Sequence, residues 1–121
     1  FMFKVYGLKN CDTCRKAMKW LAAEGFESQL HDIRKDGLEA AQVAFWARAV
    51  GWELLLNRRG TTWRGLDDAE KEDLTEAKAI ALMEAAPALM KRPIFVSDKN
   101  VHVGFKPADL ETVRQMAGAS A

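Results

Sequence analysis

The chain has 121 residues, of which 49% are hydrophobic and 29% charged, which is enough apolar material for one globular domain with its own core. A net charge of +1 does not indicate the strongly basic surface of a nucleic-acid or membrane binder. The apolar runs fall far short of the roughly 18 residues that span a bilayer. The given sequence also shows no basic-then-apolar amino-terminal segment of the kind that marks a secretory signal. We therefore predict a cytoplasmic monomer without a membrane or direct nucleic-acid partner, and we expect Met2 rather than Phe1 to be the natural first residue.

The first third of the chain predicts a strand, a helix and a second strand. β-Branched and aromatic residues indicate a strand over residues 2–6. Apolar residues then recur at helical spacing and predict a helix over residues 16–24, capped by Asn10 or Cys11 and ended by Gly25. Residues 27–33 form a weaker strand pattern, which a polar turn over residues 34–37 follows.

The middle of the chain, about 38–86, predicts helices alone. A helix over residues 38–50 ends at Gly51, and the run Leu54-Leu55-Leu56 is expected to be buried. A polar break at residues 57–60 predicts a loop that faces something anionic. Two short helices follow, over residues 66–73 and 75–86, and Pro87 stops the second.

The last third predicts a hairpin and a helix. Residues 94–97 and 101–105 form its two strands around a turn at residues 98–100, and Pro107 opens the final helix, whose end at residues 118–121 should fray. The order β-α-β, helices, β-β-α is that of a thioredoxin-like α/β fold with a helical insertion. We predict one domain over residues 1–121, with the insertion at about 38–86.

Two cysteines, Cys11 and Cys14, stand in C-x-x-C spacing where the first helix is predicted to begin. The unpaired backbone N–H groups of a helix start favour negative charge, and a thiolate supplies it. In a reducing compartment this spacing indicates a redox-active or metal-binding pair rather than a structural disulfide. A zinc site needs two more ligands, and His31 and His102 each stand alone in a predicted strand, so we expect no metal. We predict that Cys11 is a nucleophile, with an unreactive surface thiol as the alternative.

Acidity alone contributes little to the reactivity of such a thiol. With a pKa of about 8.5, about 3% of a free cysteine is thiolate at pH 7. A pKa of about 6 would raise that population about 30-fold and lower the intrinsic nucleophilicity roughly 10-fold, so that attack gains only about 2- to 3-fold. The site must therefore also position its substrate.

Cys14 lies one helical turn after Cys11 and should be less exposed. It is either a resolving thiol that closes a disulfide with Cys11 or an inert, buried helix residue. Arg92 precedes Pro93 and a strand, and a cis bond there would turn Arg92 toward the cysteines. A guanidinium beside Cys11 would lower the pKa of the thiol and bind an oxyanion or carboxylate, whereas the alternative is an ordinary surface arginine.

Further cations are candidates for the same site. The pair Arg58-Arg59 is either part of an anion site or solvated surface. Positive potential near the cysteines also comes from Lys9, Arg15 and Lys16, of which the last two are equally consistent with the outer helix face. The tryptophans indicate core and loop packing rather than stacking platforms, although Trp63 could line the cleft.

Several segments together resemble one protein family, the arsenate reductase (ArsC)-like and Spx-like proteins, and are most similar to its small YffB-type branch. They cover nearly the whole chain and read Tyr6-Gly7-Leu8-Lys9-Asn10-Cys11-Asp12-Thr13, His31-Asp32 with Arg34 and Asp36-Gly37-Leu38, Gly51-Trp52, Leu55-Leu56-Asn57, Arg59-Gly60-Thr61-Thr62-Trp63-Arg64 and Lys91-Arg92-Pro93. The resemblance implies a four-stranded mixed sheet flanked by helices, with an all-helical insertion between the βαβ and ββα halves of a thioredoxin fold.

The resemblance also implies residue roles. Cys11 would be the catalytic cysteine and Arg92 the arginine before a cis-proline. Asn57 stands where the first of three oxyanion-binding arginines would align, and Lys106 stands near the third, so the resemblance implies a thiol reductase rather than an arsenate reductase. The residues expected to act are, for catalysis, Cys11, Cys14 and Arg92 and, for substrate binding, Asn10, Thr13, Arg58, Arg59, Pro93 and Lys106.

Two functions follow as hypotheses. The first is a thiol/disulfide reductase that acts on a small anionic or thiol substrate with glutathione as co-substrate and a glutaredoxin as a further partner. The second is an Spx-like regulator that binds RNA polymerase and is switched by a disulfide between Cys11 and Cys14. The cationic residues and the segment pattern favour the enzyme.

Overall fold

The computed structural model describes residues 3–39 and 41–120, which form two compact units. One unit consists of the chain up to Gly37 and from Arg92 onward, and the other of Leu38–Lys91. Met2 lies outside the described residues, so the expectations that Met2 is the natural first residue and that the first strand begins there concern an undescribed residue. No helix in the described ranges is long and apolar enough to cross a membrane.

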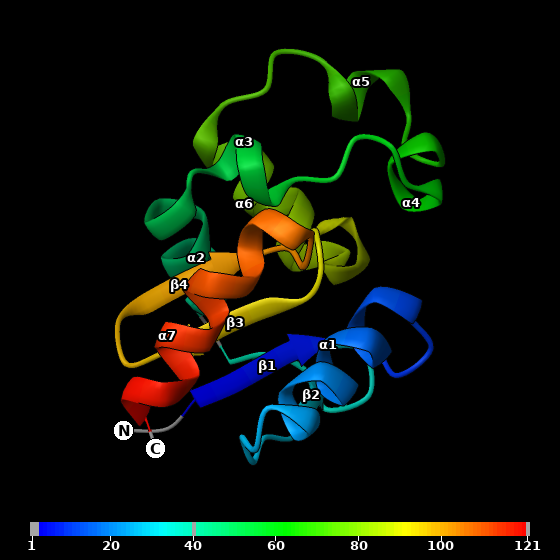
Figure 1. Ribbon diagram of the computed structural model, residues 1–121. Helices are drawn as coiled ribbons and strands as arrows, with labels where there is room; N and C mark the ends of the chain where they lie inside the picture. Colours follow the sequence, from blue (N-terminus) through cyan, green and yellow to red (C-terminus); the bar gives the residue numbers. More distant parts are fainter. Residues whose placement is uncertain (1–2, 40, 121) are drawn as a thin grey trace. The chain divides into compact units, whose positions relative to one another are not determined.

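The first unit is built on a four-stranded mixed sheet in the order β2-β1-β3-β4 (Figure 1). Its strands are β1 (Phe3–Gly7), β2 (Leu30–Asp32), β3 (Ile94–Ser97) and β4 (Asn100–Val103). β1 pairs in parallel with β2 and antiparallel with β3, and β3 pairs antiparallel with β4. Parallel pairing of β1 and β2 needs a crossover, which α1 supplies, and β3 and β4 form the predicted hairpin. The predicted thioredoxin-like fold is confirmed.

Two helices, α1 (Asp12–Ala23) and α7 (Leu110–Ser120), share the core of this unit with the two central strands. Val5 of β1 lies opposite Phe95 of β3, and both side chains are fully buried. The helices add small and branched apolar residues to the same cluster, namely Ala17, Leu21, Val113 and Ala117. These residues recur at helical spacing, so one apolar stripe on each helix meets the sheet.

α1 ends as the sequence predicts, and α7 runs longer. Gly25, with φ of +86°, follows the end of α1, and its N–H donates to the carbonyl of Ala22 (3.1 Å) while the N–H of Phe26 donates to that of Leu21 (2.9 Å). Glycine adopts this left-handed conformation without a steric penalty. At the other end of the chain, Pro107 begins a short 3-10 turn, η2 (Pro107–Asp109), that leads into α7. The expected fraying is wrong for residues 118–120, which remain helical, and Ala121 lies outside the described residues.

The second unit contains five helices and one 3-10 turn among its described residues. They are α2 (Gln42–Val50), α3 (Trp52–Leu55), α4 (Thr61–Arg64), α5 (Asp68–Lys71), α6 (Glu76–Ala85) and η1 (Pro87–Leu89). Buried side chains on α2, α3 and α6 include Val43, Trp46, Leu55, Ile80 and Met83. An isolated antiparallel β-bridge pairs Leu56, which follows α3, with Met90, which follows η1. The predicted helical insertion is confirmed.

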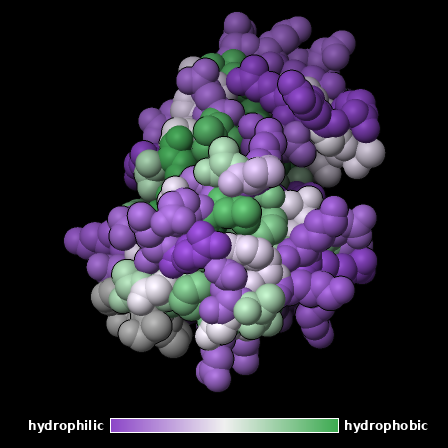
Figure 2. Space-filling view, in the orientation of Figure 1, coloured by the Kyte–Doolittle hydropathy of each residue, from purple (hydrophilic) through white to green (hydrophobic). Residues whose placement is uncertain are grey.

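One expectation in this unit is wrong. Leu54 is 50% exposed, whereas Leu55 and Leu56 are buried as predicted. Consecutive residues of a helix point in different directions, so α3 cannot bury Leu54 together with Leu55. Phe45 on α2 is also exposed, at 44%. Figure 2 shows that hydrophilic residues make up most of the visible face, with hydrophobic residues exposed in small groups.

Candidate functional site

Cys11 lies at the junction where β1 gives way to α1. Its backbone is extended (φ −99°, ψ 120°), its N–H donates to the carbonyl of Leu8 (3.2 Å), and its own carbonyl accepts the N–H of Arg15 (3.0 Å). The residue is therefore the N-cap of α1, as the sequence predicts. The neutral thiol makes no capping hydrogen bond, so a negative charge on the sulfur is what the unpaired N–H groups of the first turn would favour.

The surroundings of the Cys11 sulfur favour its ionised form. Partial burial raises the pKa of the Cys11 thiol, but the nearby backbone N–H and thiol of Cys14 lower it, as do the charge and the nearby side chain of Arg92. The lowering effects prevail, so the pKa of Cys11 lies below its ordinary value. A partly exposed cysteine in an electropositive environment is the type of thiol that reacts as a nucleophile.

Cys14 has the opposite character although it lies one turn away on the same helix. Its side chain is fully buried, and both cysteines are in the free thiol form. Burial, the largest cause, and the neighbouring Cys11 sulfur together raise the pKa of Cys14 to about 12, against the opposing hydrogen bond from the N–H of Leu8. The two thiols of this C-x-x-C pair thus have strongly separated acidities.

Arg92 reaches the site from a segment remote in the sequence. It lies two residues before the start of β3, is partly buried and is joined to Pro93 by a cis peptide bond. Pro93 is buried, and its carbonyl accepts the N–H of Gly104 (3.0 Å), which fixes the backbone next to Arg92. The charge of Arg92 lowers the pKa of Cys11, which agrees with a guanidinium near that sulfur, and the roles of Arg92 in catalysis and substrate binding stay predictions.

The loop before Cys11 is held through both backbone groups of one residue, Lys9. The N–H of Lys9 donates to Oδ2 of Asp32 (3.0 Å), and the carbonyl of Lys9 accepts Nε of Arg15 (3.0 Å). Arg15 therefore fixes the loop as well as adding positive charge.

Asp32, at the end of β2, is buried and also accepts the N–H groups of Arg34 and Lys35, both at 2.9 Å. These backbone donors, Lys35 first and Lys9 next, hold the pKa of the Asp32 carboxyl below its ordinary value. Our sequence reasoning missed this residue as a support of the site. The sequence signal was a carboxylate at the end of an apolar strand. If such a carboxylate is buried, it needs hydrogen-bond donors.

The remaining predicted substrate residues of the first unit are exposed. Asn10 is in the turn before Cys11, and Thr13 is the second residue of α1. Lys106 begins the turn η2, where its backbone N–H donates to Oδ2 of Asp109 (2.7 Å). Their binding roles stay predictions.

Arg58 and Arg59 belong to the second unit, in the loop between α3 and α4. The guanidinium of Arg58 lies over the rings of Trp52 (5.7 Å) and Trp63 (5.9 Å), and Nζ of Lys71 also lies over Trp63 (5.6 Å). Cations at this distance are attracted by the negative faces of the indole rings, so Arg58 is held by the two helices that flank its loop.

Arg59 is exposed, and its backbone is fixed instead. Its N–H donates to Oδ1 of Asn57 (3.0 Å), and its carbonyl accepts Nη1 of Arg64 (2.7 Å). The loop therefore distinguishes the two arginines that the sequence presents as an equivalent pair, because only Arg58 has its charge over aromatic rings.

No group of three or more His, Cys, Asp and Glu residues that could hold a metal ion occurs in residues 3–39 and 41–120. His31 and His102 are partly buried strand residues, as predicted. Nε2 of His31 bonds to the carbonyl of Gly37 (2.7 Å), and Nε2 of His102 bonds to Oδ1 of Asp109 (2.8 Å).

Comparison with known proteins finds close similarity over almost the whole chain. An uncharacterised protein of Haemophilus influenzae is 42% identical over 91% of this chain and 96% of its own. The solved structure of the YFFB protein is 41% identical, with a TM-score of 0.86 over 93% of this chain and 98% of its own. An arsenate reductase (ArsC) related protein from Brucella melitensis is 42% identical, with a TM-score of 0.76 over 93% of each chain.

More distant relatives are named as regulators. The regulatory protein MgsR of Bacillus subtilis is 28% identical over 93% of this chain and 94% of its own, and the global transcriptional regulator Spx 2 of Lactococcus lactis is 25% identical over 90% and 83%. The model of the ArsC family matches residues 6–113, a span that contains both cysteines, Arg92 and all four strands except the start of β1. This chain is a member of the ArsC family.

Proposed function

We propose that this protein is a cytoplasmic thiol/disulfide reductase in which Cys11 is the nucleophile and glutathione the reducing co-substrate. The observation that carries the proposal is the environment of the Cys11 sulfur, which is partly exposed at the start of α1 and whose pKa is lowered by Cys14 and by the charge of Arg92. ArsC family membership and the ArsC-related relatives support a reductase.

The reaction proceeds in two exchange steps. The Cys11 thiolate attacks one sulfur of a disulfide substrate, so that a mixed disulfide forms on Cys11 and the second sulfur leaves as a thiolate. A glutathione thiolate then attacks the substrate sulfur of that mixed disulfide, which releases Cys11 as a thiolate and leaves the substrate sulfur bound to glutathione. A lowered pKa helps most in this second step, where Cys11 is the leaving group.

Arg92 has two tasks in this scheme. Its charge keeps the departing Cys11 sulfur anionic, and its planar guanidinium is suited to a carboxylate of glutathione or of the substrate. Asn10, Thr13, Arg59, Lys106 and Pro93 are proposed as further substrate contacts, with Arg58 supporting its loop. A glutaredoxin is proposed to reduce the glutathione mixed disulfide that the reaction leaves.

A glutathione-coupled assay with a small disulfide tests the proposal. Cys11→Ser should abolish turnover, and Arg92→Gln should lower it about tenfold while the pKa of Cys11 rises toward its ordinary value of about 8.5. Lys99→Gln, which removes an exposed charge from the turn between β3 and β4, is the matched control and should leave turnover unchanged. Undiminished turnover in Cys11→Ser would exclude Cys11 as the nucleophile.

A second candidate is a redox-switched regulator that binds RNA polymerase. The C-x-x-C pair and the relatives MgsR and Spx 2 favour it. Here a disulfide between Cys11 and Cys14 would alter a binding surface instead of completing a catalytic cycle. Capture of RNA polymerase by the immobilised protein, compared under reducing and oxidising conditions, separates the two functions. Absence of binding in both states would remove this candidate.

A further inference from the structure

A histidine and an aspartate outside the cysteine site join β4 to the turn before α7. Nε2 of His102, on β4, lies 2.8 Å from Oδ1 of Asp109, the last residue of η2. An ionised carboxylate only accepts hydrogen bonds, so Nε2 of His102 is the donor in this contact. The two side chains are 26% and 20% exposed, so the contact is shielded from solvent better than an ordinary surface ion pair. Neither residue takes part in the proposed exchange steps.

The other oxygen of the same carboxylate holds Lys106. Oδ2 of Asp109 accepts the N–H of Lys106 (2.7 Å), and the N–H of Asp109 donates to the carbonyl of Lys106 (2.8 Å). Both backbone groups of Lys106 are therefore bound to one residue, whose carboxylate His102 orients by its bond to the first oxygen. Lys106 itself is exposed, so a solute can reach its side chain.

Gly104 connects this carboxylate to the segment that carries Arg92. Its N–H donates to the carbonyl of Pro93 (3.0 Å). Its φ is +104°, and a Cβ built on it would lie 3.2 Å from Oδ2 of Asp109, so the carboxylate packs directly against this backbone. The backbone of Lys106, two residues further on, is thus set relative to the peptide beside Arg92 by hydrogen bonds and a close contact.

We propose that Asp109 and His102 are positioning residues that hold the backbone of Lys106 so that its ammonium group meets an anionic group of the disulfide substrate. Asp109 acts on Lys106 directly, and His102 acts through Asp109. The substrate half rests on the proposed function, because it needs a disulfide that reacts with Cys11. The hold on the Lys106 backbone is measurable without any substrate.

The first measurement is the rate at which Cys11 attacks two disulfide probes, dithiobis(nitrobenzoate), which is a dianion, and dithiodipyridine, which is neutral. Each reaction joins the Cys11 sulfur to one half of the probe and releases the other half as a coloured product, and Cys11→Ser is the blank. The ratio of the dianion's rate constant to that of the neutral probe reports how the site treats negative charge. Lys106→Ala should lower this ratio about threefold, whereas Lys99→Ala, which removes an exposed cation from the turn between β3 and β4, should leave it nearly unchanged.

The variant Asp109→Ala gives charge and positioning opposite signs. By charge alone, the loss of a carboxylate favours the dianion and raises the ratio. Loss of positioning lowers the ratio to that of Lys106→Ala, and the double variant should be no lower, because Asp109 then has no side chain left to position. Asp109→Asn keeps an oxygen for the N–H of Lys106 and should not fall below the wild type.

His102 is tested by the same comparison. His102→Phe keeps a ring without a donor and should lower the ratio, and His102→Gln, which keeps an N–H donor, should restore it. If Asp109→Ala fails to fold, His102→Phe decides the question, because it leaves the carboxylate in place.

The second measurement is amide hydrogen exchange followed by NMR. The N–H of Lys106 should exchange about tenfold faster in Asp109→Ala than in the wild type or Asp109→Asn. The N–H of Phe26, which is bonded to the carbonyl of Leu21 at the end of α1, is the control and should not change.

A ratio that rises in Asp109→Ala, or an exchange rate of Lys106 that stays the same, would overturn the proposal. A wild type in which Cys11 attacks neither probe would refute the proposed function and with it the substrate role of Lys106. The hold on the Lys106 backbone would still stand or fall by the exchange measurement.

Discussion

At the end of β1, the backbone of Gly7 passes so close to Cys14 that no larger residue fits there without moving the sulfur. We predict that Gly7→Ala lowers the free energy of unfolding by about 1–3 kcal/mol, the usual cost of overpacking a core. In a Cys14→Ala background the loss should be much smaller, because the other neighbours of the new methyl group, Leu30 Cδ1 (3.4 Å) and Cys14 Cβ (3.5 Å), lie at ordinary contact distances. Urea unfolding of the wild type, the two single variants and the double variant measures this. Equal losses in both backgrounds would mean that the new methyl group clashes with a neighbour other than the Cys14 sulfur.

The lowered pKa of Asp32 makes the stability of the folded protein depend on pH. Its pKa is lowered in the folded state, so its contribution to stability is fully present above the ordinary value of about 3.9 and is lost as the pH falls through the folded value. We predict that Asp32→Asn is less stable than the wild type at pH 7 and that the difference shrinks as the pH falls below about 4. Urea unfolding from pH 7 to pH 3 checks this, and a difference that stays constant with pH would contradict it.

Single residues also mark where sequence reasoning succeeded and where it could not. The cysteine at the helix start was predictable, because the turn and the apolar spacing on either side are local patterns. The support from Asp32 and the tight approach of Gly7 were not, because each depends on which backbone atoms the fold brings near from another strand or helix. The raised pKa of Cys14 follows from its burial and the lowered pKa of Cys11 partly from Arg92, and the spacing C-x-x-C determines neither.

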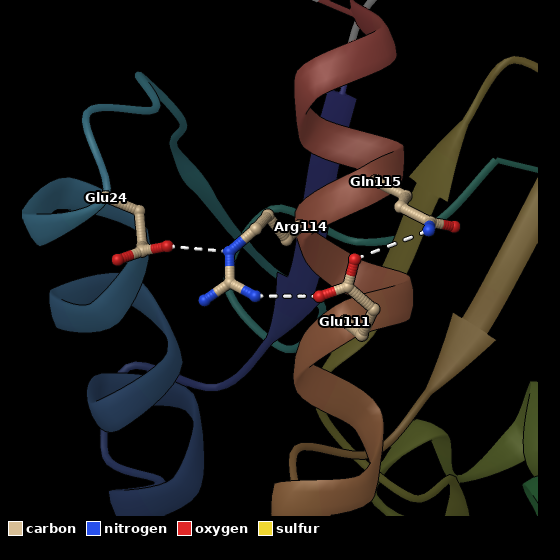
Figure 3. A network of polar contacts seen from close by, with 4 residues as sticks. All are labelled: Glu24, Glu111, Arg114 and Gln115. Atoms are coloured by element: carbon tan, nitrogen blue, oxygen red, sulfur yellow. Dashed lines mark hydrogen bonds and ion pairs between the residues drawn. The ribbon is translucent and has the colours of Figure 1, made fainter.

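Between elements, Arg114 joins α7 to α1, as Figure 3 shows. α1 has no basic residue in its last turn, and its C-cap is Glu24, whose charge is unfavourable beside the negative end of the helix dipole. Nε of Arg114 donates to Glu24 (2.8 Å), Nη1 donates to Glu111 (2.9 Å), and the guanidinium lies over the ring of Trp20 (5.2 Å). Arg114 therefore supplies from α7 the cation that α1 lacks.

A double-mutant cycle of Arg114→Gln and Glu24→Gln should show a coupling of about 0.5 kcal/mol in unfolding free energy that weakens at high salt. The pair Arg48 and Glu76 is the matched control, since its atoms are further apart (3.5 Å) and its side chains more exposed. That cycle should give a coupling near zero. A larger coupling in the control than in the Arg114 pair would contradict this account.

Elements with strong local signals were predicted closely, and those decided by tertiary partners were not. The strand at Ile94–Ser97 was predicted to the residue. The helix expected from residue 38 begins only at Gln42, because Ala41 has a positive φ (72°) and the Gln42 side chain accepts the N–H of Glu39 (2.7 Å). The strand expected over residues 27–33 shrinks to Leu30–Asp32, the residues that pair with Val5–Gly7 of β1.

For the molecule as a whole, the sequence predicted the position of the helical insertion but not its end. The second unit continues to Lys91, because the N–H of Lys91 donates to the carbonyl of Leu55 (2.8 Å) and Met90 pairs with Leu56. These contacts join segments far apart in the chain, which local patterns do not reveal. That the two units behave as one domain stays a prediction.

Burial should rank the phenylalanines by their importance to stability. Phe95, fully buried in the core of the first unit, should lose about 3–5 kcal/mol of unfolding free energy on truncation to alanine. Phe45, which is 44% exposed in the second unit, should lose less than about 1 kcal/mol and serves as the matched control. Chemical denaturation of both variants tests this ranking, and a greater loss in Phe45→Ala would reverse it.

The pairing of β1 with β3 has a consequence for the newly made protein. Cys11 leaves the ribosome early, whereas Arg92 and the strand that follows it emerge only after the whole insertion has been translated. A nascent chain therefore carries this cysteine without its arginine until the insertion has been translated, and the part of the lowered pKa of Cys11 that Arg92 contributes is acquired only after that.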